Sequence, residues 1–434
     1  MLDLVDLGKR SFSAYRGIAP DEQLDEVLRL SKRLRGLRCL QLNATPYGGG
    51  VSELLRSGVA LLNDLGIVTD WRIIRGDQAF FQVTKRLHNG LQGGKGGFSE
   101  SDKATYLAQS RLNASQLSGD YDVIIVHDPQ PAALPMLGGD RGARWVWRCH
   151  IDTAHPNPEA WEFLRPFLGA YDAAIFTLPE FIPPAFPISQ IAIHSPAIDP
   201  LSPKNLTLPE DLARRVLEWI GVRLDQPLVT QISRFDPWKD PLGVIAAYRL
   251  VGKHMPELQL AMVGSLALDD PEGWDVYRQI QEATASDNLI HIFTNLVGVG
   301  NIEVNAFQSL SDVVIQKSIR EGFGLVVSEA LWKGTPVVAG RAGGIPLQMP
   351  EGTGGILVDS VEECAQAVLR LLKNPQQAHE LGARGREHVR QHFLMPRMML
   401  DYLRLLDSMV HDKPLEPRAP AVLQEHSASA GAPG

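Results

Sequence analysis

Residues 313–329 read Val-Val-Ile-Gln-Lys-Ser-Ile-Arg-Glu-Gly-Phe-Gly-Leu-Val-Val-Ser-Glu. The three β-branched residues Val313–Ile315 predict a short buried strand, and the residues that follow the glycines predict a helix. Two acidic residues, Glu321 and Glu329, flank the Gly-Phe-Gly turn between these elements. A strand that passes through a glycine turn into a helix is the repeating unit of a parallel α/β sheet.

The same alternation of strands and helices continues on both sides of this stretch. We expect strands at Leu37–Leu42, Val123–Val126, Trp145–Cys149, Ala173–Phe176, Ile191–Ile193, Leu228–Ile232, Leu258–Val263, Leu289–Phe293, Val313–Ile315, Pro336–Ala339 and Ile356–Val358. We expect helices at Gly50–Leu65, Leu242–Lys253, Val327–Lys333 and Val361–Leu372. Alternating strands and helices predict an α/β fold with parallel sheets that are covered on both faces.

The chain has 434 residues, which predicts about two domains. Four prolines between Ser195 and Pro209 disfavour both helices and central strands, so we place the domain boundary there. We therefore expect α/β domains at 1–205 and 206–393. The glycine-rich stretch Gly76–Gly97 predicts an irregular mobile loop or hairpin, and the composition of residues 411–434 predicts disorder.

Composition excludes several classes of function. The hydrophobic fraction is 44%, the charged fraction 21% and the formal net charge −8, which argues against a nucleic-acid partner. Three cysteines, Cys39, Cys149 and Cys364, make no disulfide framework or zinc motif. The sequence has no basic leader and no apolar run of about 18 residues, so we expect a cytoplasmic protein without a membrane span.

Charged residues follow two expected strands of the second half. Arg234 and Lys239 come after Leu228–Ile232 and could supply two cations to a diphosphate. The alternative for Arg234 is a surface ion pair with Asp236. Glu321 could accept hydrogen bonds from sugar hydroxyls and Glu329 from ribose hydroxyls, although a helix N-terminus also favours acids for its dipole alone.

Two glycine clusters follow other expected strands. Gly48, Gly49 and Gly50 lie between the strand Leu37–Leu42 and a helix, where backbone N–H groups could approach a phosphate closely. This cluster lacks the Lys-Ser/Thr of a P-loop, and a tight turn without a ligand is the alternative. The stretch Gly340-Arg-Ala-Gly-Gly344 is a second glycine turn of this kind, which a structural role would also explain.

Polar pairs follow two expected strands of the first half. His127-Asp128 follows Val123–Val126, and His150 and Asp152 follow Trp145–Cys149. Histidine and aspartate at such strand ends could hold and polarise a sugar hydroxyl. The motif Asp120-Tyr-Asp122 precedes a strand instead of following one, so we reject it as a metal site.

The acidic and glycine motifs together resemble family 4 of the GT-B glycosyltransferases, and within it the trehalose synthases of the glycosyltransferring type. The likeness covers about residues 36–405. The longest matching stretches are Trp147–Asp152, Trp161–Leu164, Asp199–Asn205, Gln231–Lys239, Asp269–Trp274 and Glu303–Gln308. The resemblance implies a GT-B fold, which has two Rossmann-like domains and a deep cleft between them. It also implies a final helix at about 395–408 that packs back on the first domain.

The resemblance also implies a reaction and roles for the motif residues. It implies reversible transfer of glucose, with retention, from a nucleoside diphosphate to glucose, giving α,α-trehalose without an obligatory cofactor. A Mg²⁺ ion, a homodimer and the identity of the base stay open. The implied catalytic residues are Arg234, Lys239, Glu321 and His150; the implied donor-binding residues are Gly48, Gly49, Gly50, Gly322, Phe323, Gly324, Leu325, Glu329 and Asn295; and the implied acceptor-binding residues are Asp152, His127 and Asp128.

Three other functions fit the same residues. A retaining trehalose phosphorylase shares these motifs, and another family 4 transferase would use a different acceptor. A non-catalytic sensor of nucleotide sugars would need no complete set of charged residues, so the presence of Arg234, Lys239, Glu321 and Glu329 argues against it.

Overall fold

The computed structural model describes residues 1–47, 49–138, 142–266 and 271–415. The chain divides into two compact units, which we call unit 1 (Met1–Ala197 and the chain from Met395 onward) and unit 2 (Ile198–Leu394). Both are α/β, as predicted. Residues 198–205, which the sequence placed at the end of the first domain, lie in unit 2. They are held there because the Trp332 indole donates to the Asn205 carbonyl at 3.1 Å.

Unit 1 contains a seven-stranded sheet in the order β1-β3-β2-β4-β5-β6-β7. Its strands are β1 (Asp3–Leu4), β2 (Arg38–Asn43), β3 (Val68–Ile73), β4 (Val123–His127), β5 (Arg144–Arg148), β6 (Ala173–Phe176) and β7 (Ile191–Ile193). Its helices are α1 (Asp21–Arg33), α2 (Gly50–Asp64), α3 (Gln78–Leu91), α4 (Glu100–Gln116), α5 (Leu134–Gly138), α6 (Pro158–Leu168) and α15 (Met395–Val410), with 3₁₀ turns at Phe12–Tyr15 and Pro179–Phe181. Only β1 is antiparallel to its neighbour; the other pairs of this sheet are parallel.

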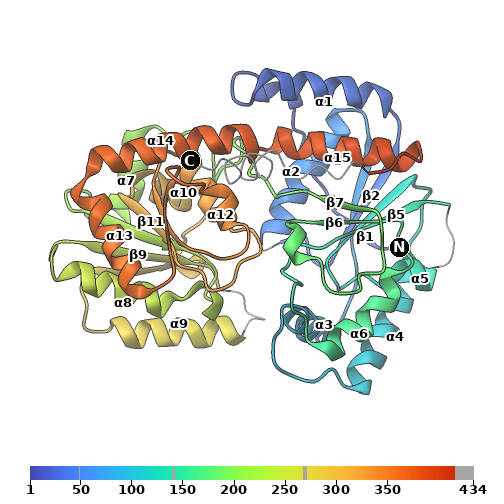
Figure 1. Ribbon diagram of the computed structural model, residues 1–434, viewed down its shortest axis with the longest axis horizontal. Helices are drawn as coiled ribbons and strands as arrows, with labels where there is room; N and C mark the ends of the chain where they lie inside the picture. The colour runs from blue at the N-terminus through green and yellow to red at the C-terminus, as the bar shows by residue number, and fades with distance from the viewer. Residues whose placement is uncertain (48, 139–141, 267–270, 416–434) are drawn as a thin grey trace, which may run out of the picture. The chain divides into compact units, whose positions relative to one another are not determined.

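Helix α15 belongs to unit 1 although it ends the described chain. It lies alongside α1 and packs on α2 (Figure 1). The Arg33 guanidinium donates to both oxygens of Asp407, at 2.9 and 3.0 Å, and Arg404 donates to Glu26 at 2.8 Å. Beyond this helix, residues 416–434 of the predicted disordered tail lie outside the described residues.

Two elements of unit 1 differ from the prediction. The stretch Gly76–Gly97 is mostly helical, because α3 occupies Gln78–Leu91 and the Asp77 carboxylate caps it by accepting from the Phe80 N–H at 2.8 Å. Gly90 lies in the last turn, where a side chain would meet the Ala160 methyl at 2.9 Å. The strand β3 was not predicted, because polar residues alternate with its apolar ones; it pairs with β2 over six residues.

Unit 2 contains a parallel six-stranded sheet in the order β10-β9-β8-β11-β12-β13. Its strands are β8 (Leu228–Ile232), β9 (Gln259–Gly264), β10 (Ile290–Thr294), β11 (Val313–Gln316), β12 (Val337–Gly340) and β13 (Gly355–Val358). Its helices are α7 (Glu210–Trp219), α8 (Pro241–Gly252), α9 (Pro271–Thr284), α10 (Asn301–Leu310), α11 (Leu325–Trp332), α12 (Ile345–Gln348), α13 (Val361–Lys373) and α14 (Pro375–His392), with 3₁₀ turns at Pro237–Lys239 and Asn295–Val297. Because β8, β11 and β12 are neighbours, the loops that follow them meet at one edge of the sheet.

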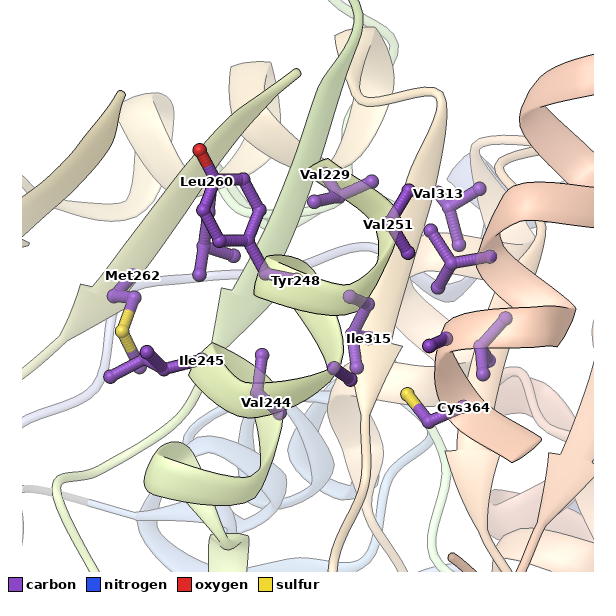
Figure 2. Packing of buried hydrophobic residues seen from close by; sticks show 14 of the residues in the cluster. Val229, Val244, Ile245, Tyr248, Val251, Leu260, Met262, Val313, Ile315 and Cys364 are labelled. Atoms are coloured by element: carbon purple, nitrogen blue, oxygen red, sulfur yellow. The ribbon is translucent and has the colours of Figure 1, made fainter. Parts of the chain in front are cut away.

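The hydrophobic core of unit 2 holds in place the strands that end at this edge of the sheet. Figure 2 shows Val244, Ile245, Tyr248 and Val251 of α8 pointing toward β8, β9 and β11, with Cys364 of α13 on the same side. Each fully buried aliphatic side chain contributes about 1.5–3 kcal/mol to stability. Val338 of β12 belongs to the same cluster, so the strands that carry the site loops, β8, β11 and β12, share one apolar layer.

Two further facts bear on the predicted class of protein. Cys39, Cys149 and Cys364 are buried free thiols. Among the helices of the described residues, none is both long enough and apolar enough to cross a membrane.

Candidate active-site residues of the two units

The loops after β8 and β11 bring Lys239 and Glu321 together. The Lys239 ammonium donates to Oε2 of Glu321 at 2.5 Å, and the Ser318 hydroxyl donates to the same oxygen at 3.2 Å. Both charged side chains are mostly buried, with exposed fractions of 16% and 10%. This is a charge-assisted hydrogen bond, which is stronger than a neutral one. The sequence named both residues as catalytic, and the structure makes them direct partners.

Glycines allow the loop after β12 to lie directly against Glu321. A side chain at Gly343 would place its Cβ 1.8 Å from the Glu321 carbonyl oxygen, and Gly343 has a φ of +50°. The neighbouring Gly344 N–H donates to the Gly322 carbonyl at 3.0 Å. Gly324, with a φ of +82°, then caps α11 and Leu325 begins it. The Gly340–Gly344 turn thus supports the Gly-Phe-Gly turn that follows β11.

Arg234 is more exposed than Lys239. Its guanidinium approaches the Asp236 carboxylate at 3.5 Å, and its side chain is 62% exposed. This is the surface ion pair that the sequence left as the alternative. Such a pair stabilises the fold very little, so Arg234 can exchange Asp236 for an anionic ligand at low cost.

Glu329 is buried in α11, and its partners were missed in the sequence. Gln308 donates to Oε2 of Glu329 at 2.9 Å, and the Lys204 ammonium lies 3.5 Å from Oε1. Lys333 donates to the Glu329 carbonyl at 3.1 Å, and burial lowers the pKa of Lys333 to about 7. Lys204 and Gln308 lie in stretches that match the family, which was the only signal for them.

Other donor-binding candidates are engaged within unit 2. The Asn295 amide donates to the Leu266 carbonyl at 3.0 Å and accepts from the Leu266 N–H at 2.8 Å. Phe323 is buried against Phe393, with ring centroids 5.4 Å apart. Asn295 and Phe323 therefore shape their loops, and backbone groups beside them remain the candidate ligand contacts.

The glycine cluster of unit 1 opens α2. Gly50 is the first residue of this helix, and Gly49 caps it with a φ of +86°. Gly48 lies outside the described residues. The positive φ explains the need for glycine at position 49 without a ligand, so the tight-turn alternative accounts for that position.

His127 and His150 form a hydrogen-bonded chain with Gln41 of β2. Nδ1 of His127 lies 2.8 Å from Nε2 of His150, and Nε2 of His127 lies 2.7 Å from Oε1 of Gln41. Burial, together with the Arg148 charge, lowers the pKa of His127 to about 3 and that of His150 well below its usual value. Both rings are therefore neutral at pH 7.

The side chains of Asp128 and Asp152 accept hydrogen bonds from backbone N–H groups of the loops in this region. Asp128 has a φ of +64°, its carboxylate accepts from the His150 N–H at 2.9 Å, and burial raises its pKa to about 7. Asp152 is partly buried and accepts from the Ala154 N–H at 2.9 Å. Each of the two aspartates is thus a loop-forming residue that also lies beside the chain of histidines.

The rejected Asp120-Tyr-Asp122 motif precedes β4, where the Asp122 carboxylate accepts from the Arg38 N–H at 2.8 Å. Within the described ranges, no group of three His, Cys, Asp or Glu residues is arranged to hold a metal ion.

Comparison with known proteins places both units in one family. Residues 41–183 match the family model "Trehalose synthase, N-terminal domain", and residues 218–388 match "Glycosyl transferases group 1". A trehalose synthase from Rubrobacter xylanophilus is 49% identical over 94% of this chain and 100% of its own, and one from Pyrococcus horikoshii is 43% identical over 93% and 97%. A trehalose phosphorylase from Pleurotus pulmonarius is 29% identical over 79% of this chain but 53% of its own.

Solved structures agree on the fold. An α,α-trehalose-phosphate synthase from Burkholderia xenovorans superimposes with a TM-score of 0.70 at 14% identity, covering 86% of this chain and 100% of the other. A sucrose-phosphate synthase from Thermosynechococcus elongatus gives 0.66 at 18% identity, covering 87% and 100%. With the matched family models and the two relatives above 40% identity, these observations show that the chain is a glycosyltransferase of the GT-B fold and belongs to the trehalose synthase family.

Proposed function

We propose that this enzyme makes α,α-trehalose by transferring glucose, with retention and reversibly, from a nucleoside diphosphate to free glucose. The observation that carries the proposal is the Lys239–Glu321 pair at the β8–β11 edge, within a chain that is 49% identical to a trehalose synthase. A buried cation and a carboxylate that share one hydrogen bond suit a ligand with a phosphate next to a sugar. The cation can bind phosphate oxygens while the carboxylate accepts from sugar hydroxyls.

The donor would bind to unit 2. Its diphosphate would compete with Glu321 for Lys239 and with Asp236 for Arg234, and both cations would then stabilise the charge that develops on the leaving group. Glu329 would accept from the ribose hydroxyls through Oε1, since its 3.5 Å separation from Lys204 is longer than a good hydrogen bond. Gly322 and Gly324 leave backbone groups open to the ligand, and no metal ion is required.

The sugar acceptor would bind to unit 1. Glucose is neutral and rich in hydroxyls, so neutral imidazoles and aspartates are suitable partners for it. His150 would polarise a sugar hydroxyl, with Asp152, His127 and Asp128 around it. No protein carboxylate acts as a nucleophile in this proposal; the leaving phosphate takes the acceptor proton on the face from which it departs.

The cytoplasm is the proposed compartment. Its thiol buffers keep cysteines reduced, which matches three buried free thiols.

Product analysis tests the proposed function. Purified protein is incubated with glucose and each of UDP-, ADP- and GDP-glucose, and separately with glucose and glucose 1-phosphate. We expect trehalose and nucleoside diphosphate with at least one nucleotide donor. Trehalose from glucose 1-phosphate alone would replace the proposal with a phosphorylase, and a disaccharide other than trehalose would replace it with another sugar transferase.

A further inference from the structure

Arg148 is a buried charge that makes no ion pair with a carboxylate of the described residues, although its charge interacts with that of Asp128. It lies at the end of β5, its residue is 1% exposed, and it donates to the His194 carbonyl at 3.0 Å. Its guanidinium also lies over the Tyr402 ring, 5.7 Å from the centroid. Burying a charge without a counter-ion costs several kcal/mol, so this arginine needs an explanation beyond stability.

The surroundings of Arg148 connect it to the chain of histidines. A small cavity beneath α2 and α15 is lined by polar groups of Gln41, His127, His150 and Tyr402 together with Arg148, and by apolar side chains of both helices. The charged or titratable groups near the two imidazoles include Arg148, Asp128, Asp152, His194 and Tyr402. Asp128 and Asp152 are the acids among them, and burial raises the pKa of Asp128 to about 7. The positive charge of Arg148 therefore opposes protonation of both rings.

The hydrogen-bond chain has a direction. The amide oxygen Oε1 of Gln41 can only accept, so Nε2 of His127 must carry the hydrogen in their 2.7 Å contact. Nδ1 of a neutral His127 then has no hydrogen and must accept from Nε2 of His150, 2.8 Å away. A neutral His150 with its hydrogen on Nε2 has a bare Nδ1, which can only accept a hydrogen bond.

We propose that Gln41, His127 and Arg148 are positioning residues that hold His150 as a neutral ring with its hydrogen on Nε2, so that Nδ1 accepts a hydrogen bond from a sugar hydroxyl. Gln41 accepts from Nε2 of His127 and so determines which nitrogen of that ring carries hydrogen. His127 in turn determines which nitrogen of His150 carries hydrogen, and the charge of Arg148 disfavours protonation of the other nitrogen of His150. The statement that a sugar binds Nδ1 of His150 rests on the proposed function. The positions of the hydrogens on the two rings do not depend on that function, so they can be tested separately.

The direct test is ¹⁵N NMR of the full chain labelled at histidine, which distinguishes a ring nitrogen that carries hydrogen from one that does not. His127→Gln and His150→Gln variants assign the two rings. We expect both rings to carry hydrogen on Nε2 only at pH 7. Hydrogen on Nδ1 of His150, or on both nitrogens, would overturn the inference even if the enzyme makes trehalose.

Variants at position 41 test the direction. Gln41→Glu offers only acceptors to His127 when the new carboxyl is ionised, so at such a pH we expect the Nε2–H form of both rings to persist. Gln41→Leu offers none, so we expect a mixture of forms at His150 and a KM for glucose raised about 10-fold, with unchanged affinity for nucleoside diphosphate. A single unmixed form in Gln41→Leu would contradict the role of Gln41.

The pH dependence of kcat/KM for glucose tests Arg148. We expect the wild type to keep its rate as the pH falls through about 6, the ordinary range for histidine. Arg148→Met should lose activity there because His150 becomes protonated, and Arg148→Lys should restore the wild-type profile. Arg144→Met removes a more exposed arginine of the same strand and serves as the matched control. Identical acid profiles for wild type and Arg148→Met would overturn the role of Arg148.

Discussion

The two candidate sites use opposite electrostatics. In unit 2 the site residues are ionised and paired, as in Lys239 with Glu321 and Arg234 with Asp236. In unit 1 they are imidazoles kept neutral by burial, joined in a chain that begins at Gln41. The ion pairs suit an anionic ligand that can replace one partner. The neutral chain suits a ligand that offers only hydroxyl groups.

This contrast indicates what each loop must preserve. A cation that binds phosphate has to be available to the ligand. Arg234 is exposed and Lys239 has one carboxylate partner in Glu321, so a phosphate can replace the present partner of each cation. A hydroxyl-binding ring has to be fixed in orientation and protonation, because one misplaced hydrogen turns an acceptor into a donor. The cations that would bind phosphate lie on loops. The position of the hydrogen on the histidine rings depends on Gln41, which lies inside a strand.

The largest expected effect is the loss of a cation in unit 2. Lys239→Ala and Arg234→Ala should each lower kcat by about 10²-fold, because each removes charge stabilisation from the leaving diphosphate. Thermal melting checks the fold, and Lys253→Ala, an exposed lysine of the same unit, is the control. Turnover near that of the wild type in either variant would contradict the role of that cation.

The two acids of unit 2 should separate binding from transfer. Glu329→Gln should weaken nucleoside diphosphate binding about 10-fold or more, because a charged hydrogen-bond partner of the ribose is lost. Glu321→Gln should mainly reduce kcat, because in the proposed binding mode Glu321 contacts the transferred sugar. Calorimetry with the diphosphate measures the first effect, and an equal loss of affinity in both variants would reject the assignment.

A smaller effect is expected at Asp152 in unit 1. Asp152→Asn keeps an oxygen for the Ala154 N–H but removes the charge, so the loop should survive while the KM for glucose rises about 10-fold. Asp152→Ala removes the loop bond as well and is the comparison variant. Weaker diphosphate binding together with a lower melting temperature in Asp152→Asn would reduce this residue to its structural role.

The last prediction concerns stability instead of activity, and it involves Asp128. Burial raises its pKa from an ordinary value near 4 to about 7, so the folded state favours the protonated form. Its contribution is fully present below about pH 4 and is lost as the pH rises to about 7. Asp128→Asn keeps an acceptor for the His150 N–H and tolerates the positive φ, so it should stabilise the protein by up to about 4 kcal/mol at pH 8, from about three pKa units.

Denaturant unfolding of wild type and Asp128→Asn at pH 4 and pH 8 measures this difference. We expect the two proteins to be similar at pH 4 and to diverge at pH 8. A constant difference between them at both values would show that the Asp128 carboxyl has an ordinary pKa.

The fold could be predicted from the sequence wherever strands are mainly apolar. The expected strands Ala173–Phe176, Ile191–Ile193 and Leu228–Ile232 have the observed bounds. The strand β3 was missed because its alternating polar residues lie near an end of the sheet. Helix α3 was missed because glycines near its C-terminal end outweighed the cap at Asp77.

The charged residues of the candidate sites were proposed from the sequence, whereas their partners were not. Lys239 and Glu321 follow strands that are distant in sequence, and only the strand order shows that β8 lies beside β11. Gln41 and Arg148 are polar residues inside apolar strands, so no turn or glycine marks them. Which nitrogen of a histidine ring carries hydrogen depends on such partners, and the hydrophobic periodicity of the sequence does not reveal them.

Isotope tracing tests the central claim of retaining transfer most directly. The nucleotide donor found active carries ¹³C at C1 of its glucose, and NMR follows the reaction with unlabelled glucose. We predict one ¹³C-labelled α-anomeric carbon per trehalose molecule and one nucleoside diphosphate released for each. A β-configured label, or label released as free glucose without disaccharide, would contradict the account.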